Sequence, residues 1–285
     1  MRATKIEQRD NSFSIDFNRP SRFTLLFAGF GLALLVASWV HIIGISKSRT
    51  SVLNSETIDR TMEFVGDLAG GGMSSWTSAN WSGIAQLTWD TIAMSVLASG
   101  MAGLGAILLM PLATRKSPRG LAGNVKFTIY QLTRFSFLFT RSVPELLWAL
   151  IVIFVLSPGI FAGAVALAIH NFGVLGRLNA DVAEDLDESS IIALESSGAS
   201  TLQRYVSGTL PLIARQLLTF QFYRWEVVIR TTAVVGFVAA SGIGYQLRLD
   251  LNFFRYPEVG QLLATYLVIV WAVDFLSVMV RRSFK

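Results

Sequence analysis

Long apolar segments alternate with polar ones along most of the chain, and their lengths predict helices that cross a membrane. The first, 23–45, is an uncharged run of 23 residues. A hydrocarbon core about 30 Å thick needs about 20 helical residues at about 1.5 Å each, so this run can span it. Five more apolar segments follow, at 87–112, 126–156, 160–176, 210–237 and 261–280. The pattern predicts an all-α polytopic membrane protein with about six transmembrane helices.

A cleaved signal peptide is the competing interpretation of the first apolar segment. Signal peptides have an apolar region of about 7 to 15 residues and end in a small-x-small cleavage site. This segment is longer, and it ends in the sequence Trp-Val-His-Ile-Ile. An uncleaved spanning helix is therefore favoured.

The composition agrees with a membrane protein that binds no cofactor of its own. Apolar residues make up 52% of the chain and charged residues 15%, a balance typical of polytopic proteins. Cysteine is absent, which excludes disulfides and thiolate metal sites. The two histidines, His41 and His170, cannot hold a metal without carboxylates from elsewhere.

The distribution of basic residues predicts the orientation. Lys and Arg outnumber Asp and Glu by 24 to 19, and in a chain with several spans this excess reports topology rather than nucleic-acid binding. If both termini are cytoplasmic, the interior segments hold fourteen Lys or Arg and the exterior segments, 46–86 and 241–257, hold five. Interior loops are enriched in these residues, so the count favours cytoplasmic N and C termini.

One polar stretch, 180–211, lies between strongly apolar segments. We expect a short helix from about Ile191 to Ser197, stopped by Gly198, and a second helical run that ends at Leu210-Pro211. Such a hairpin is too polar for lipid and too small to fold alone. The predicted topology places it in the cytoplasm.

This stretch resembles the cytoplasmic coupling loop of ABC importer permeases, whose pattern is E-A-A, three residues, G, nine residues, I, one residue, L-P. Gly198 and Leu210-Pro211 stand at the required separation, and Ala193 fills the middle alanine position. Three positions depart from the pattern, which are Ile192, Leu194 and Gly208. Because the leading Glu is missing, any salt bridge that it makes must be absent or come from Glu188 or Glu195.

Other segments look like the phosphonate-type branch of that family. They are 141–150, 170–176, and 223–230 followed by Gly236 and 241–244. The resemblance covers 87–285, whereas the first 86 residues carry no motif. It divides the chain into 1–86, with a cytoplasmic N-terminus, the first transmembrane helix and an exterior segment, and 87–285, the permease core with the coupling loop 180–211.

The resemblance implies a type I ABC importer permease fold and a non-catalytic subunit of the bacterial inner membrane. Two permease copies, expected as a homodimer, would form the pathway. Two cytoplasmic ATPase subunits would use ATP and Mg, and an extracytoplasmic binding protein would deliver phosphonate, phosphite or phosphate. The residues that would contact the ATPase are Ile192, Ala193, Leu194, Glu195, Gly198, Ala199, Ser200, Leu210 and Pro211.

Polar side chains recur at helical spacing within the apolar segment 210–237. They are Arg215, Thr219, Tyr223, Glu226 and Arg230, and they share one stripe of a helix. Charges at membrane depth normally face a protein interior or an aqueous path. Glu226 and Arg230 are expected to pair. The pair would be either an internal salt bridge that holds the helix in place or a polar wall of the pathway, where Arg230 would attract an anion. Arg224 projects from the opposite side, toward an interface.

Glu145 has two explanations. The segment 126–156 is too long for one simple span, so we expect an interfacial helix and then a span, with a break at Ser142-Val-Pro-Glu145. This spacing matches a capping box, in which the Ser and Glu side chains bond reciprocally to backbone N–H groups. Capping is the simpler explanation, and contact with the transported solute is the alternative.

The chain shows no motif for nucleotide hydrolysis, since a G-x-x-x-x-G-K-[ST] run is absent. The acidic cluster at 181–188 is more simply a solvated face than a contact with basic residues of an ATPase. Two other classes remain. An ion-coupled secondary transporter would use its intramembrane charges as a relay, but no inverted repeat is visible. A membrane-embedded enzyme would need a catalytic set, which cannot be assembled here.

Overall fold

The structure is a computed structural model that describes residues 22–49, 55–69, 80–114, 123–187, 189–239 and 241–283. The expected cytoplasmic segment 1–21, parts of the exterior segment 46–86, and Glu188 lie outside these ranges. The chain forms two compact units, Met1–Glu63 and Phe64–Lys285, and each is described by itself.

The first unit contains α1 (Arg22–Arg49), and α2 (Ser55–Leu68) crosses the boundary between the units. Phe23–Ile42 within α1 is long and apolar enough to cross a membrane. A helix that is apolar on all sides is suited to lipid or to a protein interior.

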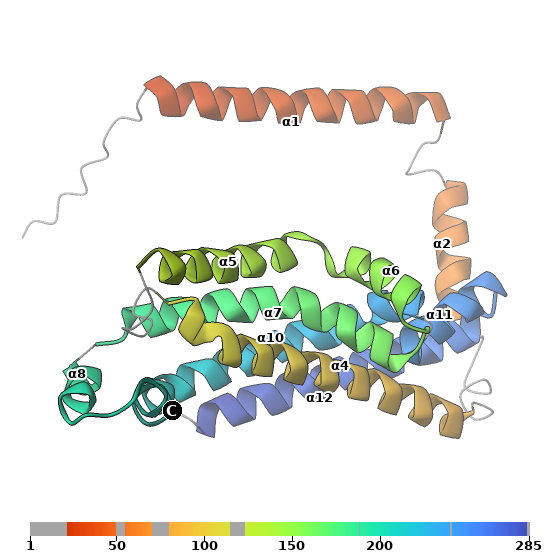
Figure 1. The fold of residues 1–285 in the computed structure, drawn as a ribbon. Helices are drawn as coiled ribbons and strands as arrows, with labels where there is room; N and C mark the ends of the chain where they lie inside the picture. The colour runs from red at the N-terminus through yellow and green to blue at the C-terminus, as the bar shows by residue number, and fades with distance from the viewer. Residues whose placement is uncertain are drawn as a thin grey trace, which may run out of the picture. The chain divides into compact units, whose positions relative to one another are not determined.

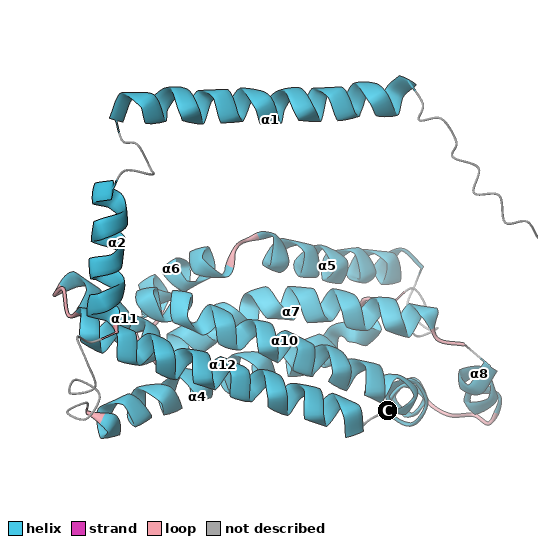
Figure 2. Cartoon of the chain, turned by 180° about the vertical axis from the view of Figure 1, so that it is seen from behind, coloured by secondary structure: helices cyan, strands magenta, loops and turns pink. Residues whose placement is uncertain are grey.

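The second unit is a helical bundle, and the described part of the chain contains no strand (Figures 1 and 2). Its elements are α4 (Trp81–Leu109), η1 (Met110–Leu112), α5 (Gly123–Ser142), α6 (Glu145–Val155), α7 (Ile160–Asp185), α8 (Ser189–Ser196), α9 (Thr201–Gln203), the π-helix η2 (Arg204–Thr209), α10 (Leu210–Ala239), α11 (Gly242–Asn252) and α12 (Tyr256–Ser283).

The predicted number of spans agrees with the helices found. Four helices of the chain, α1, α4, α7 and α12, are long and apolar enough to cross a membrane, and the number rises to six if each of two bent pairs counts as one span. The pairs are α5 with α6, bent by 98°, and the α9–α10 run with α11, bent by 55°. α6 has only 11 residues, about 16 Å of helix, so it is too short to be the separate span expected after the break.

The centre of the bundle is α7, which carries small residues on several faces. Nine of them are buried, which are Ala162, Gly163, Ala164, Ala166, Ala168, Gly173, Gly176, Ala180 and Ala183. A Cβ on Gly163 would lie 2.3 Å from the sulfur of Met94 in α4, and one on Gly176 would lie 2.4 Å from the ring of Phe137 in α5. Small residues let helix backbones approach closely where lipid gives no hydrophobic driving force.

The helices of the second unit alternate in direction, so their connections gather at two ends (Figure 1). α8, the start of α5 and the end of α12 lie at one end, and the end of α6 and α11 lie at the other. The segments predicted to be cytoplasmic within this unit thus share one end, which is the end that carries the polar hairpin.

Among the element boundaries that differ from those predicted, three change the description of the fold most. α4 begins at Trp81 rather than near 87, because the side chain of Asn80 accepts a hydrogen bond from the Gly83 N–H (3.1 Å) and caps the helix. α7 continues to Asp185 rather than ending near 176. The segment expected as an exterior connection after 241 is largely the helix α11, whose residues Ile243 and Leu247 are buried one turn apart.

We expect Gly173→Ala to lower the free energy of unfolding by about 1–3 kcal/mol, as overpacking does. Its Cβ would lie 2.5 Å from the carbonyl oxygen of Phe137 and 2.8 Å from the backbone nitrogen of Arg141, and backbone atoms cannot move aside cheaply. Gly100→Ala is the control, because nothing lies within 4 Å of its Cβ. Unfolding in detergent should show the second variant unchanged or more stable; equal losses would contradict the close approach of α5 and α7.

Candidate functional site

The polar hairpin begins with α8, which ends as predicted at Gly198. The N–H of Ala199 donates to the carbonyl of Leu194 (3.1 Å), and the N–H of Gly198 donates to that of Glu195 (3.0 Å). These two bonds form a Schellman motif, which needs a left-handed residue after the helix. Gly198 supplies it with φ +84°, and no atom lies within 4 Å of a Cβ placed there. The glycine is therefore required by backbone conformation rather than by lack of space.

The chain re-enters helical structure at once after this turn. Ser200 caps α9 through a reciprocal capping box, since its N–H donates to the Oε1 of Gln203 (2.8 Å) and its Oγ accepts from the Gln203 N–H. The π-helix η2 then leads directly into α10. The second helical run thus does not end at Leu210-Pro211 as expected. Pro211 lacks the N–H of an α-helical bond, and the wider π turn just before it accommodates this loss.

An ion pair and a hydrogen bond brace the hairpin. The Glu195 carboxylate lies 3.0 Å from Nη1 of Arg204, so Glu195, one of the two acids considered in place of the missing leading Glu, forms a salt bridge within the hairpin. The Tyr205 hydroxyl donates to the carbonyl of Ile107 at the end of α4 (2.7 Å). The α-helical donor for that carbonyl would be residue 111, which is a proline without an N–H. Tyr205 therefore satisfies a carbonyl that α4 cannot satisfy itself.

A shallow groove of about 470 Å³ lies within the hairpin. It is lined by Ala193, Leu194, Ser197, Ser207, Gly208, Pro211 and Leu212. Ile192, at the rim of α8, is 53% exposed. Three of the residues expected to contact a partner, Ala193, Leu194 and Pro211, thus line one surface together with Gly208, where the family pattern has a larger Ile.

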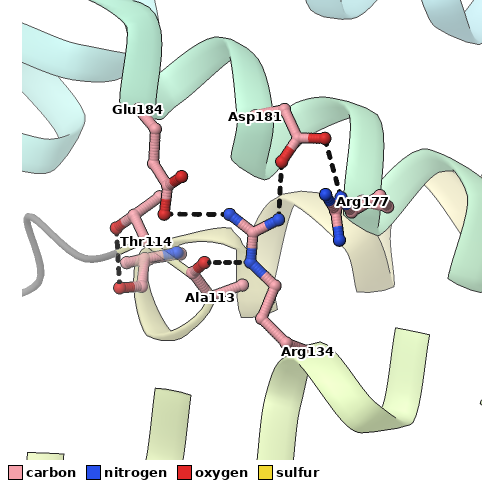
Figure 3. A network of polar contacts seen from close by, with 7 residues as sticks. Ala113, Thr114, Arg134, Arg177, Asp181 and Glu184 are labelled. Carbon is pink, nitrogen blue, oxygen red and sulfur yellow. Dashed lines mark hydrogen bonds and ion pairs between the residues drawn. The ribbon is translucent and has the colours of Figure 1, made fainter. Parts of the chain in front are cut away.

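A network of charges joins α5, the C-terminal part of α7 and the turn after η1 (Figure 3). Arg134 of α5 is only 10% exposed and lies 2.5 Å from Asp181 and 2.9 Å from Glu184, both in α7. Its Nε donates to the carbonyl of Ala113 (2.8 Å), and Arg177 also pairs with Asp181 (2.7 Å). Two members of the acidic cluster interpreted as a solvated face are therefore engaged by Arg134.

The predicted pair of Glu226 and Arg230 is wrong, because each binds a residue of α12 instead. The Glu226 carboxylate lies 2.7 Å from Arg281, and Nη2 of Arg230 lies 2.6 Å from Asp274. The stripe on α10 thus fastens this helix to α12.

The capping box expected at Ser142 and Glu145 is also absent. The Ser142 hydroxyl donates to the carbonyl of Leu138 (2.6 Å) because α5 continues through Ser142, and Pro144 precedes α6 without a side-chain cap. Glu145 instead lies 3.2 Å from Nε2 of His170 in α7. Nδ1 of the same ring lies 2.9 Å from the carbonyl of Val143, which can only accept, so Nδ1 carries a proton.

Arg224 points into the bundle rather than toward a separate interface. Its Nε donates to the side-chain oxygen of Asn171 in α7, a residue that is only 1% exposed. Glu145 is close enough to interact electrostatically with the guanidinium. Four polar residues from α6, α7 and α10 thus meet. The sequence signal for this cluster was the polar pair His170-Asn171 within an apolar span, but the sequence did not show which residues these two would contact.

Neither a metal nor a catalytic centre emerges from these contacts. Within the described ranges, no group of three or more His, Cys, Asp or Glu side chains could hold a metal ion. The site consists instead of a protruding braced hairpin and of polar contacts that run through a helical bundle.

This combination is a helical bundle with membrane-length apolar helices and a polar hairpin. Residues 120–284 match the family described as binding-protein-dependent transport system inner membrane component, and the chain belongs to this family.

The chain is 30% identical over 257 residues to the phosphite transport system permease protein PtxC of Stutzerimonas stutzeri. The aligned residues cover 90% of this chain and 87% of that protein. It is 29% identical to the phosphate-import permease protein PhnE of Mycolicibacterium smegmatis, over 70% of this chain and 36% of that protein. The fold resembles that of the MetNI methionine ABC transporter in an inward-facing conformation, with a TM-score of 0.57 at 19% identity, over 71% of this chain and 96% of that one. The predicted ABC permease fold and the phosphonate-type resemblance are confirmed.

We expect Arg134→Gln to lower the free energy of unfolding by about 1–3 kcal/mol, because buried charge-assisted hydrogen bonds would be lost. The cost stays below that of a fully buried pair since Asp181 is 42% exposed. Arg177→Gln is the control: Arg177 is 47% exposed, and such surface pairs contribute about 0.5 kcal/mol. Similar losses in both variants, measured by unfolding in detergent, would refute a special role for Arg134.

Proposed function

We propose that this chain is the transmembrane subunit of an ATP-driven importer for phosphite, phosphate or a related phosphonate. The observation that carries the proposal is the braced hairpin, which sits in a chain that belongs to the binding-protein-dependent family and covers most of a phosphite permease. The chain forms the pathway in the bacterial inner membrane, with both termini in the cytoplasm. It hydrolyses no ATP itself.

The partners follow from the family. A second permease copy completes the pathway, two cytoplasmic ATPase subunits bind the hairpins and use ATP and Mg, and an extracytoplasmic protein delivers the solute. The groove at Leu194, Gly208 and Pro211 is the surface that receives the ATPase. Ile192, Ala193, Glu195, Ala199 and Ser200 shape or rim this surface.

Force on the hairpin reaches the bundle through covalent and packed contacts. η2 is continuous with α10, and Tyr205 and Leu210 pack against a cluster that includes Met110 of η1 and Ala183 of α7. Movement of α8 is therefore passed to the helix that carries the intramembrane charges. A coupling of this kind requires a mechanically continuous element between the two sites.

Tyr223 and Glu145 are the pathway residues among those expected from the sequence. Tyr223 is 56% exposed on α10, and Glu145 lies where α6 begins. Glu226 and Arg230 hold α10 against α12 through their ion pairs, so they support the pathway wall instead of binding solute.

Uptake by the assembled importer tests the function directly. The chain, its ATPase and its binding protein in proteoliposomes should take up radiolabelled phosphite in a manner that requires ATP and is blocked by vanadate. Uptake by the chain alone under an ion gradient would overturn the proposal in favour of a secondary transporter.

We expect Gly198→Val to abolish the stimulation of ATPase activity by solute-loaded binding protein while the complex remains inserted. A β-branched residue cannot adopt the φ of +84° without strain, so the turn after α8 would be lost. Gly198→Asn is the matched control, since asparagine tolerates the left-handed conformation and open space surrounds the site. Normal stimulation in the valine variant would contradict coupling through this hairpin.

A further inference from the structure

Arg224 lies at the middle of α10, whose run with α11 is long and apolar enough to cross a membrane. It is the fifteenth of the 30 residues of α10, which places it about 21 Å along the helix axis from Leu210 at about 1.5 Å per residue. Its partner Asn171 is likewise near the middle of α7, whose bounds are Ile160 and Asp185. A charge at this depth is costly and normally faces protein or an aqueous path.

Arg224 differs from other arginines of the bundle in how its charge is balanced. Arg134, Arg230 and Arg281 each lie within 2.9 Å of a carboxylate. For Arg224 the described part of the chain provides no such ion pair. Its one hydrogen bond there runs from Nε to the neutral amide of Asn171. The positive charge is held in place but is not neutralised by that contact.

The two terminal nitrogens of Arg224 remain available. The Nε of Arg224 donates to Asn171. Neither of its Nη atoms is among the buried polar atoms of the described residues that lack a hydrogen-bond partner. Next to it, Tyr223 is more than half exposed. The nearby Glu145 is already engaged by His170, at 3.2 Å. The two Nη groups of an arginine form a planar fork that matches two oxygens of a phosphate-like anion.

We propose that Arg224 is the residue that contacts the transported phosphorus oxyanion at mid-membrane, and that Asn171 is its positioning residue. This inference rests on the proposed function and adds the side chain that recognises the solute inside the pathway. Asn171 is itself fixed, because its Nδ2 donates to the carbonyl of Leu167 (2.7 Å), so its oxygen is presented to Arg224. The pair Glu145 and His170 borders the site, and its carboxylate limits how long an anion stays bound.

A permanent counter-charge for Arg224 is the competing explanation, and it predicts a different result. If Glu145 or a carboxylate of a second permease copy neutralises Arg224, the arginine is structural. In that case, introducing a further carboxylate beside Arg224 leaves transport unchanged. If the solute itself is the counter-ion of Arg224, the introduced carboxylate competes with the solute and lowers transport.

The test uses the complete importer in proteoliposomes with radiolabelled phosphite and phosphate as probes, and uptake is measured per ATP hydrolysed. Arg224→Gln should lower this ratio at least tenfold, and Arg224→Lys should recover part of it because the charge returns without the fork. Asn171→Asp, nearly isosteric, places a carboxylate on Arg224 and should also lower the ratio at least tenfold. Its melting temperature in detergent should equal or exceed that of the wild type.

Arg248→Gln is the matched control, because Arg248 lies over the ring of Tyr245 on α11 and outside this cluster; its uptake ratio should stay within about twofold of wild type. If Arg224→Gln and Asn171→Asp both take up the probes with the same uptake per ATP as the wild type, the assignment of Arg224 is overturned. The proposed function would still stand. Loss in Arg224→Gln alone, with normal transport by Asn171→Asp, would make Arg224 structural and also overturn it. If the wild type takes up neither probe nor a radiolabelled alkylphosphonate, the proposed function fails and this inference fails with it.

Discussion

Close approach of helices to α7 is the constraint on which the bundle depends. Lipid offers no hydrophobic reward for bringing helices together, so contact must come from van der Waals packing and polar bonds. Gly163, Gly173 and Gly176 allow neighbouring atoms to sit where a Cβ would stand. The packing of α4 and α5 against α7 in turn brings Arg134 to Asp181. That ion pair then fixes the ends of the helices beside the hairpin.

Charged residues of the bundle have two kinds of partner: some pair with an opposite charge, whereas Arg224 bonds to a neutral amide. Arg134 joins α5 to α7 and to the end of α4, and the pairs of Glu226 with Arg281 and Arg230 with Asp274 join α10 to α12. These pairs neutralise charged side chains of the bundle. Arg224 is anchored by an amide, which orients the guanidinium and leaves its charge for another group. The contrast separates residues that hold helices together from one suited to bind an anion.

The sequence was sufficient for features that are local. The approximate number of spans and the stop at Gly198 follow from segment length and glycine chemistry, and the structure agrees with both. The sequence left the salt bridge open between no partner, Glu188 and Glu195, and the structure shows one at Glu195. Partner choice between helices was not predictable. Spacing on α10 identifies Glu226 and Arg230 as neighbours on one helix, but α12 offers each a partner of opposite charge, and that packing decides. The same limit applies to Arg224, since spacing gives a side chain's direction but not the helix that it meets.

The bond from Tyr205 to the carbonyl of Ile107 makes the hairpin part of the bundle's own architecture. Because Pro111 leaves that carbonyl without a donor, a loop grafted from another permease would have to bring a hydroxyl to the same place. A chimera without it would leave an unsatisfied backbone oxygen at the end of α4. The hairpin is thus not an interchangeable module, and a functional graft must keep Tyr205 of η2 together with the end of α4 to which it bonds.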